Sequence, residues 1–484
     1  MTCRYILLLG LFFSSLITGF SKEKDAYNIK IKINNLSNTE CYMGYHFAEK
    51  QYVSDTIKVD AKGNMVFSGT KPLDGGIYLV VTPSKKYFEV IIAGETEFSM
   101  ETDTLDFIKN MKVKGSKENE WFYAYLNFMG EKSKMLEPLN KKMEQYKSNK
   151  DSADAIRKRM SKIDSEVKEY KINFMKAQPN SFLAKIFRTS QDPEVPEAPK
   201  LPNGRTDSTF AYKYFKAHFF DGVDFSDARL LRTPLLYNKY KQYLEKLTYQ
   251  IPDSIAEACV YLCEKAKANK EVFKYTVVYT TSTYESSKIM GMDAVFVRLV
   301  EDYYNTGQAF WADSTLMFKI SDRARILKPL LLGKKAPNLL LYDNNKQIQQ
   351  LWAVKSKYTI LCFWDPDCSH CKKAVPQLAD TYHKSLKAKG FEVFAVCTET
   401  EEAKWLKFIE DNKLDWINVA DLELHNHFRS IYDISSTPVI YILNEKKEII
   451  AKKLGVEQVE DFMDNYIKAE QKRKMNQLQA CLYP

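Results

Sequence analysis

The chain has 484 residues, of which 45% are hydrophobic, including 30 Tyr and 28 Phe. This length and composition suit about two to four domains with packed cores. The formal net charge of +9 is spread over Lys interleaved with Glu and Asp and forms no basic patch, which argues against a nucleic-acid-binding protein.

Residues 1–21 predict a secretory signal peptide. Arg4 supplies a basic start, residues 5–17 form an apolar core, and the small residue Ser21 lies near the expected cleavage point. Such a core is too short to cross a bilayer of ~30 Å as a helix. The alternative, a buried N-terminal helix, fits poorly because the polar segment SKEKD follows directly. The start of the chain therefore predicts export to a compartment in which disulfides can form.

Residues 22–115 predict a small antiparallel β domain. The segment YNIKIKINN alternates between Tyr or Ile and polar residues, as a half-buried strand does. Further short β-like segments follow between Gly and Asp turns. Because no His, Cys or carboxylate cluster suited to catalysis occurs here, we assign this domain a structural or partner-binding role.

Residues 116–330 predict a helical region. Its apolar residues at 156, 160, 163, 167, 170 and 174 follow steps of four and three, which predicts a helix that pairs with the segment Trp121–Tyr146 as an antiparallel hairpin. Four prolines between Pro193 and Pro202 indicate a boundary or a long loop. Cys259 and Cys263 lie four apart in a helical pattern, which suits buried thiols better than a disulfide.

Residues 331–470 predict an α/β domain, and residues 471–484 a C-terminal tail. The segments NLLLY and KQIQQL suggest a β-hairpin, and strand-like and helix-like segments then alternate up to a final hairpin, PVIYILN and EIIAKKL, and a last helix. This order predicts a mixed sheet covered by helices. The whole chain is thus expected to combine a β domain, a helical middle region and a C-terminal α/β domain.

Cys368 and Cys371, in the segment FWDPDCSHC, are the candidate reactive residues. Cys368 is expected where a strand ends and a helix begins, and the free N–H groups and dipole of that helix start favour a thiolate. A thiolate attacks disulfides, and Cys371, one turn further on, could resolve the mixed disulfide. His370 can add positive charge beside the thiolate, whereas Asp365 and Asp367 act in the opposite direction.

Two other interpretations of this cysteine pair remain open. A structural zinc site needs four ligands and usually two such pairs, but the chain has no second CxxC. His425 and His427 are two apart and would lie on different faces of a helix, so we expect no metal. The pair could also be two inert buried thiols.

The segments FWDPDCSHC, GKKAPNLLLYD and SSTPVIYIL resemble the thioredoxin superfamily, in its TlpA-like branch of exported thiol–disulfide oxidoreductases. The resemblance covers about a third of the chain. It implies that Pro438 is a cis-proline facing the CxxC loop and that the backbone of Thr437 pairs with an extended substrate. The order of β domain, helical region and thioredoxin-like domain also resembles envelope proteins of Bacteroidota, which implies the periplasm or cell envelope.

The chain departs from the family pattern at two positions. Asp367 replaces the aromatic residue usual before the first cysteine, and Cys362 replaces the buried acid found on the central strand of many thioredoxins. Cys362 is thus either a quiet core residue or a third redox thiol.

Three functions are compatible with these patterns. The first is an exported thiol–disulfide oxidoreductase that needs no cofactor, acts on cysteines of protein substrates and is recycled by a membrane or periplasmic redox partner. The second, a peroxiredoxin-like enzyme, requires a P-x-x-x-T/S-x-x-C loop, but Leu361 and Asp365 occupy the Pro and Thr/Ser positions. The third is a non-catalytic binding module of the envelope. No partner among nucleic acids is expected.

Overall fold

The computed structural model describes residues 26–482, with side chains up to residue 476, so the predicted signal peptide lies outside the described residues. The chain forms two compact units, one up to Lys241 and one from Gln242 onward, and each is described by itself. Within the described residues, no helix combines the length and apolar character needed to cross a membrane.

The first unit begins with two four-stranded sheets, ordered β4-β1-β7-β8 and β3-β2-β5-β6. The strands are β1 (Tyr27–Asn34), β2 (Thr39–Phe47), β3 (Lys50–Val59), β4 (Asn64–Gly69), β5 (Gly76–Val81), β6 (Tyr87–Ile92), β7 (Glu97–Asp103) and β8 (Lys112–Lys114). The predicted alternation in β1 is confirmed, since Ile29, Ile31 and Ile33 are buried. One pairing differs from a purely antiparallel domain: β1 and β7 run parallel. The second sheet intervenes between them in the chain and provides the long connection that a parallel pair needs.

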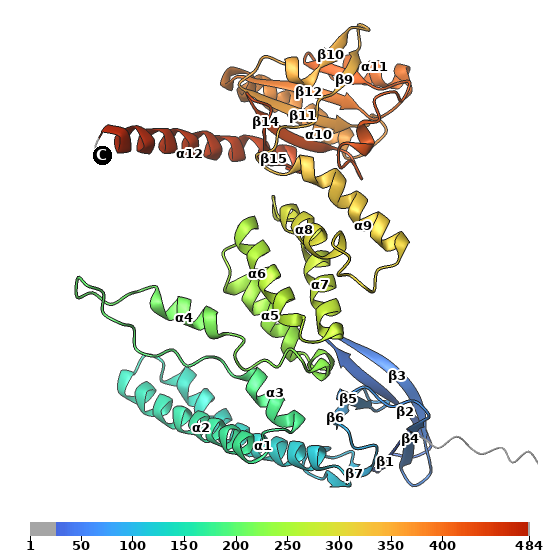
Figure 1. Ribbon diagram of the computed structural model, residues 1–484, viewed down its shortest axis with the longest axis vertical. Coiled ribbons are helices and arrows are strands. Elements are labelled where there is room, and N and C mark those ends of the chain that lie inside the picture. Colours follow the sequence, from blue (N-terminus) through green and yellow to red (C-terminus); the bar gives the residue numbers. More distant parts are fainter. Residues whose placement is uncertain (1–25, 483–484) are drawn as a thin grey trace, which may run out of the picture. The chain divides into compact units, whose positions relative to one another are not determined.

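The predicted helical hairpin is confirmed. Helices α1 (Lys117–Gln145) and α2 (Lys150–Ala177) run side by side (Figure 1). Aromatic rings join them, with Phe128 stacked on Tyr170 at 4.5 Å between ring centroids. Ser116 and Asn149 begin the two helices by accepting hydrogen bonds from backbone N–H groups of the first turns.

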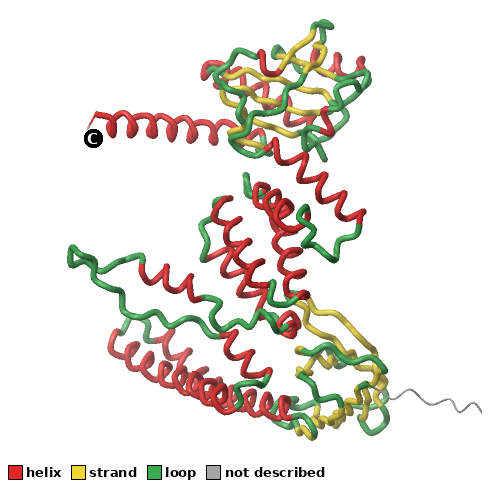
Figure 2. The backbone as a smooth tube through the Cα atoms, in the orientation of Figure 1, coloured by secondary structure: helices red, strands yellow, loops and turns green. Residues whose placement is uncertain are grey.

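The proline-rich stretch forms a long loop. It lies between α3 (Phe182–Ser190) and α4 (Phe210–His218) and is drawn as loop through most of its length (Figure 2). A 3-10 turn, Ala228–Arg232, then leads to α5 (Leu235–Lys246), and the boundary between the two compact units falls within this helix.

Helices open the second unit. They are α6 (Pro252–Ala266), α7 (Lys270–Glu285), α8 (Asp293–Leu299) and α9 (Ser314–Leu327). Cys259 and Cys263 on α6 are fully buried free thiols, as the sequence predicted.

The rest of the second unit is a seven-stranded mixed sheet of order β10-β9-β13-β12-β11-β14-β15. Its elements are β9 (Leu340–Asp343), β10 (Ile348–Gln350), β11 (Tyr358–Trp364), α10 (Cys371–Thr381), β12 (Phe391–Cys397), α11 (Glu402–Asp411), β13 (Ile417–Ala420), β14 (Val439–Asn444), β15 (Ile449–Lys452) and α12 (Val456–Leu482). Strands β11, β12 and β13 are parallel, while β9 and β14 run antiparallel to their neighbours. Helix α12 starts on the sheet and extends well beyond it (Figure 1).

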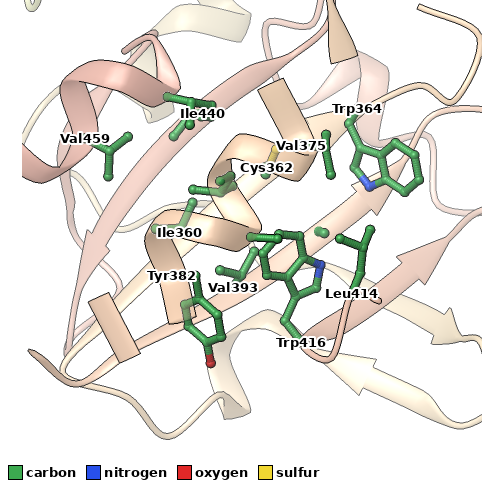
Figure 3. Packing of buried hydrophobic residues seen from close by; sticks show 14 of the residues in the cluster. Ile360, Cys362, Trp364, Val375, Tyr382, Val393, Leu414, Trp416, Ile440 and Val459 are labelled. Atoms are coloured by element: carbon green, nitrogen blue, oxygen red, sulfur yellow. The ribbon is translucent and has the colours of Figure 1, made fainter. Parts of the chain in front are cut away.

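Strand β11 lies at the centre of the core. All seven of its residues are buried, as expected for a strand covered on both faces. Ile360, Cys362 and Trp364 point to the face covered by α10 and α12 (Figure 3). Leu361 and Phe363 point to the opposite face, where they pack with Tyr432 and residues of β9 and β14. The strand thus fixes where the chain leaves the sheet toward the cysteine pair.

Candidate redox site

The cysteine pair lies in the turn that joins β11 to α10. The strand ends at Trp364, and Cys371 is the first residue of the helix. The N–H of Cys368 donates to the carbonyl of Asp365 at 3.2 Å, and its own carbonyl accepts from the N–H of Lys372 at 3.0 Å. These bonds hold the Cys368 sulfur against the helix start.

Cys368 has the surroundings of a reactive thiol. Its side chain is partly exposed, and its Sγ donates to the carbonyl oxygen of Thr437 at 3.3 Å. Burial acts to raise the pKa of Cys368, but hydrogen bonds with the side chain of Thr437, with the backbone and thiol of Cys371 and with the backbone of His370 outweigh it. The pKa of Cys368 is therefore lower than that of an ordinary cysteine, which enriches the thiolate at neutral pH.

Cys371 is the opposite kind of thiol. It is fully buried, and burial raises its pKa to about 11. Its contact with Cys368 adds to this increase, because a negative charge on one sulfur disfavours a charge on the other. At neutral pH Cys371 therefore stays a protonated thiol next to Cys368.

The loop before β14 lies against the cysteine pair. The Thr437–Pro438 peptide bond is cis, and both residues line a groove of about 470 Å³ beside α10. His370 is exposed and lines the same groove, and it acts on Cys368 through its backbone N–H. The structure thus brings His370, Thr437 and Pro438 together around the two cysteines.

Cys362 lies in the core below the helix that carries Cys371. It is 2% exposed, and burial together with the nearby Cys371 raises its pKa strongly. Cys397, which the sequence interpretation did not single out, lies in the same apolar cluster, and its pKa is raised to about 12, mainly by burial. FEVFAVC and YTILCFW are largely apolar segments, interrupted only by Glu392 and Thr359, and this pattern could have indicated that both thiols lie in one core.

A buried carboxylate supports the loop that carries Thr437. Asp433 is 4% exposed and accepts hydrogen bonds from both terminal guanidinium nitrogens of Arg323 on α9 and from Lys453 at 2.7 Å. Burial would raise the pKa of Asp433, but these partners hold it below its usual value. No sequence pattern indicated this contact, because Arg323 and Asp433 lie 110 residues apart.

Three carboxylates surround the outer side of the turn. Oxygens of Asp365, Asp367 and Glu399 lie within 4.8 Å of one another. Lys404 on α11 contacts Asp367 at 2.9 Å. The group places negative potential at the mouth of the site. This effect opposes the positive charge that His370 can add, as the sequence predicted for Asp365 and Asp367.

A CxxC turn at a helix start, a mixed sheet with β11, β12 and β13 parallel, and a cis-proline loop next to the first cysteine define a thioredoxin-like domain. Comparison with known families agrees: residues 332–452 match the AhpC/TSA family. Residues 27–122 and 147–314 match two domains of unknown function, DUF4369 and DUF5106.

Curated relatives cover the same region. The thiol-disulfide oxidoreductase ResA of Bacillus cereus is 24% identical over 136 residues, which are 28% of this chain and 76% of the relative. The sporulation thiol-disulfide oxidoreductase A of Bacillus subtilis (strain 168) is 36% identical over 103 residues, 21% of this chain and 61% of the relative. Residues 332–452 therefore form a thioredoxin-like domain that is similar in sequence to thiol–disulfide oxidoreductases.

Solved structures include a domain of a possible thiol-disulfide isomerase from Cytophaga hutchinsonii ATCC 33406. It is 46% identical, with 30% of this chain and 98% of that chain covered, at a TM-score of 0.29.

Proposed function

We propose that the protein exchanges disulfides with cysteine-containing protein substrates through Cys368 and Cys371. The observation that carries the proposal is the contrast between the two thiols. Cys368 is accessible with a lowered pKa, while Cys371 is buried with a pKa raised to about 11. The Cys368 sulfur is thus suited to the first attack, and the Cys371 thiol is suited to the later step that resolves the mixed disulfide.

In the reducing direction, the Cys368 thiolate attacks one sulfur of a substrate disulfide. The substrate S–S bond breaks, a Cys368–substrate disulfide forms, and the released substrate sulfur takes up a proton. The Cys371 thiol then loses its proton and attacks Cys368, which releases the second substrate thiol. Two electrons pass to the substrate, and the Cys368–Cys371 disulfide is left for a membrane or periplasmic redox partner to reduce.

The groove beside the cis-proline loop suits an extended substrate segment. Its walls include Ser435, Ser436 and Thr437 on one side and Gly455 on another, so polar backbone groups and small side chains border it. We assign the backbone of Thr437 to substrate pairing, because its carbonyl already contacts Cys368 at 3.3 Å. A substrate sulfur bound there would lie next to the attacking thiol.

We also propose that the protein acts in the periplasm or cell envelope. The apolar core at residues 5–17 supports cleavage near Ser21. Intact-mass analysis of protein purified from the envelope should give the mass of a chain cleaved near Ser21. A mass that still includes Met1 would contradict the proposal.

The exchange is tested with two variants in the native envelope. In Cys371→Ala the first attack proceeds and the second cannot, so mixed disulfides with envelope proteins should accumulate on non-reducing gels after an acid quench. In Cys368→Ala neither step occurs and no adduct should form. Adducts in Cys368→Ala alone would show that Cys371, and not Cys368, makes the first attack.

Two assays with the purified protein distinguish the proposed exchange from the two alternative functions. Reduction of insulin disulfides without peroxide consumption is expected, and the reverse result would favour the peroxiredoxin-like enzyme. Activity in neither assay, together with no adducts, would favour a non-catalytic binding module.

A further inference from the structure

The carboxyl ends of β11, β12 and β13 lie side by side at one edge of the sheet. The strands are parallel, and Trp364, Cys397 and Ala420 are register partners in turn. The residues that follow these three positions are therefore neighbours along one line. In open α/β sheets this edge is where ligands bind.

Carboxylates gather along this line. They are Asp365 and Asp367 after β11, Glu399, Glu401 and Glu402 after β12, and Asp421 and Glu423 after β13. Hydrogen bonds with Lys404 and with backbone N–H groups lower the pKa of Asp367 and Glu399, respectively, so both are ionised at neutral pH. We call this set the acidic edge.

The cations at this edge are fewer. Lys404 contacts Asp367 and Glu401, Lys346 lies 3.7 Å from Glu402, and Arg429 donates to the carbonyl of Thr398. Lys372 also acts on Asp367. The carboxylates outnumber these cations in a chain whose formal net charge is +9, so the edge stands out from the average surface.

A cavity of about 450 Å³ lies at the far end of the acidic edge. Leu340, Tyr342 and Leu422 give it apolar walls, and Tyr342 is 58% exposed. Two of its lining residues, Trp405 and Asn426, carry buried polar atoms, Nε1 and Oδ1, that have no hydrogen-bond partner among the described residues. Trp405 itself is only 2% exposed. One donor and one acceptor without partners match the C=O and N–H of a peptide unit.

The geometry points to the acidic edge as the binding surface for a basic segment of the substrate polypeptide next to its reactive cysteine. Lys or Arg side chains of that segment face the carboxylates, and an apolar side chain with its peptide group enters the cavity. The inference rests on the proposed exchange at Cys368, because Asp365 and Asp367 join the edge to that residue. It adds the chemistry of the preferred substrate.

The test uses cysteine peptides activated as mixed disulfides with 2-nitro-5-thiobenzoate. Release of the coloured thiol reports attack by Cys368, because the thiol of lower pKa leaves faster. The peptides carry a leucine and three lysines, or a leucine and three glutamates, on either side of the cysteine. At low ionic strength we expect the better lysine peptide to react about five-fold faster than its glutamate counterpart, and the ratio to approach one in about 0.5 M NaCl.

Variants locate the effect. Glu402→Gln with Glu423→Gln should lower the lysine-to-glutamate ratio at least about two-fold, since each exposed pair contributes little alone. Both residues are exposed, so the fold should not change. Glu410→Gln is the matched control, because it neutralises an exposed carboxylate near the other end of α11 and should leave the ratio unchanged. Tyr342→Ser should lower the advantage of a leucine over a glycine in the lysine peptide.

The outcomes separate the two proposals. If no peptide releases the coloured thiol, the exchange at Cys368 fails. If all peptides react at equal rates, or the ratio is the same in the Glu402/Glu423 variant, exchange stands and the acidic edge is overturned as the substrate-binding surface. A faster reaction with the glutamate peptides would overturn it as well.

Discussion

Replacing Arg323 by Met should destabilise the second unit through Asp433. The carboxylate is 4% exposed and, among the described residues, would keep only Lys453 as a charged partner, whose side chain is 54% exposed. Removing one partner of a buried ion pair costs about 3–5 kcal/mol, and with Lys453 still present we expect about 2–3 kcal/mol. The loop that carries Thr437 begins just after Asp433, so insulin reduction should slow as well.

The pH dependence of this effect has a definite sign. The pKa of Asp433 in the folded protein lies below its usual value, so the stabilisation by Arg323 is fully present at neutral pH. It is lost as the pH falls through that folded-state pKa, because the carboxylate is then protonated. The difference between wild type and Arg323→Met should therefore shrink in acid.

Urea unfolding followed by tryptophan fluorescence measures the cost. Five of the six tryptophans, at positions 311, 352, 364, 405 and 416, lie in the second unit, so the signal reports mainly on it. Arg325→Met is the matched control on the same helix. Arg325 forms an i,i+3 ion pair with the partly exposed Asp322, its one ion pair in the described part of the chain, so the substitution should cost less than about 0.5 kcal/mol. Adding Asp433→Asn to Arg323→Met should recover part of the loss. Equal costs for Arg323→Met and Arg325→Met would refute the reasoning.

Three further measurements test the thiols and the first unit. Iodoacetamide should modify Cys368 of the reduced protein first, and a plot of this rate against pH should level off below the ordinary thiol pKa of 9.0. Cys371 should react only as the pH approaches about 11. Labelling of Cys371 before Cys368 would reverse the roles of the two thiols. Cys362→Ala should cost about 1–2 kcal/mol in unfolding free energy but leave the lifetime of the Cys371→Ala adducts unchanged, because burial keeps Cys362 protonated; longer-lived adducts would make it a third redox thiol. The pKa of Asp227 is about 2, because hydrogen bonds from Arg229 and Lys185 outweigh burial. The ionised carboxylate therefore stabilises the folded first unit by about 2 kcal/mol above pH 4, and this stabilisation is lost as the pH falls toward 2. Urea unfolding followed by circular dichroism should show that Asp227→Asn reduces the difference between the unfolding midpoints at pH 5 and pH 2.5.

Local patterns predicted the parts of the fold that depend on local chemistry. Alternation placed β1, the heptad-like stripe placed the α1–α2 hairpin, and the CxxC segment predicted the turn between β11 and α10. The parallel pairing of β1 with β7 was missed, since hairpin signals report only neighbours in the chain. The Arg323–Asp433 contact was missed for the same reason, as a pair of charged residues far apart in sequence carries no periodic signal.

The candidate site was predictable to a similar degree. The two cysteines and the Thr-Pro pair lie in recognisable segments, so their proximity could be expected. The difference in pKa between Cys368 and Cys371 needed the packed structure, because burial and hydrogen-bond directions decide it. The acidic edge needed the strand register, which brings Glu399 to Asp365.

The pairing of β1 with β7 has a consequence for how the protein acquires its structure. Strand β1 is described from Tyr27, yet its parallel partner begins only at Glu97. Loop closure over that span costs more entropy than closing a hairpin, and contacts between distant residues slow folding. During synthesis, β1 has only β4 to pair with until β7 has also been added. Its other edge stays open for that time, and an open edge is a template for pairing with another chain. The open edge of β1 therefore needs protection from aggregation until β7 has been made.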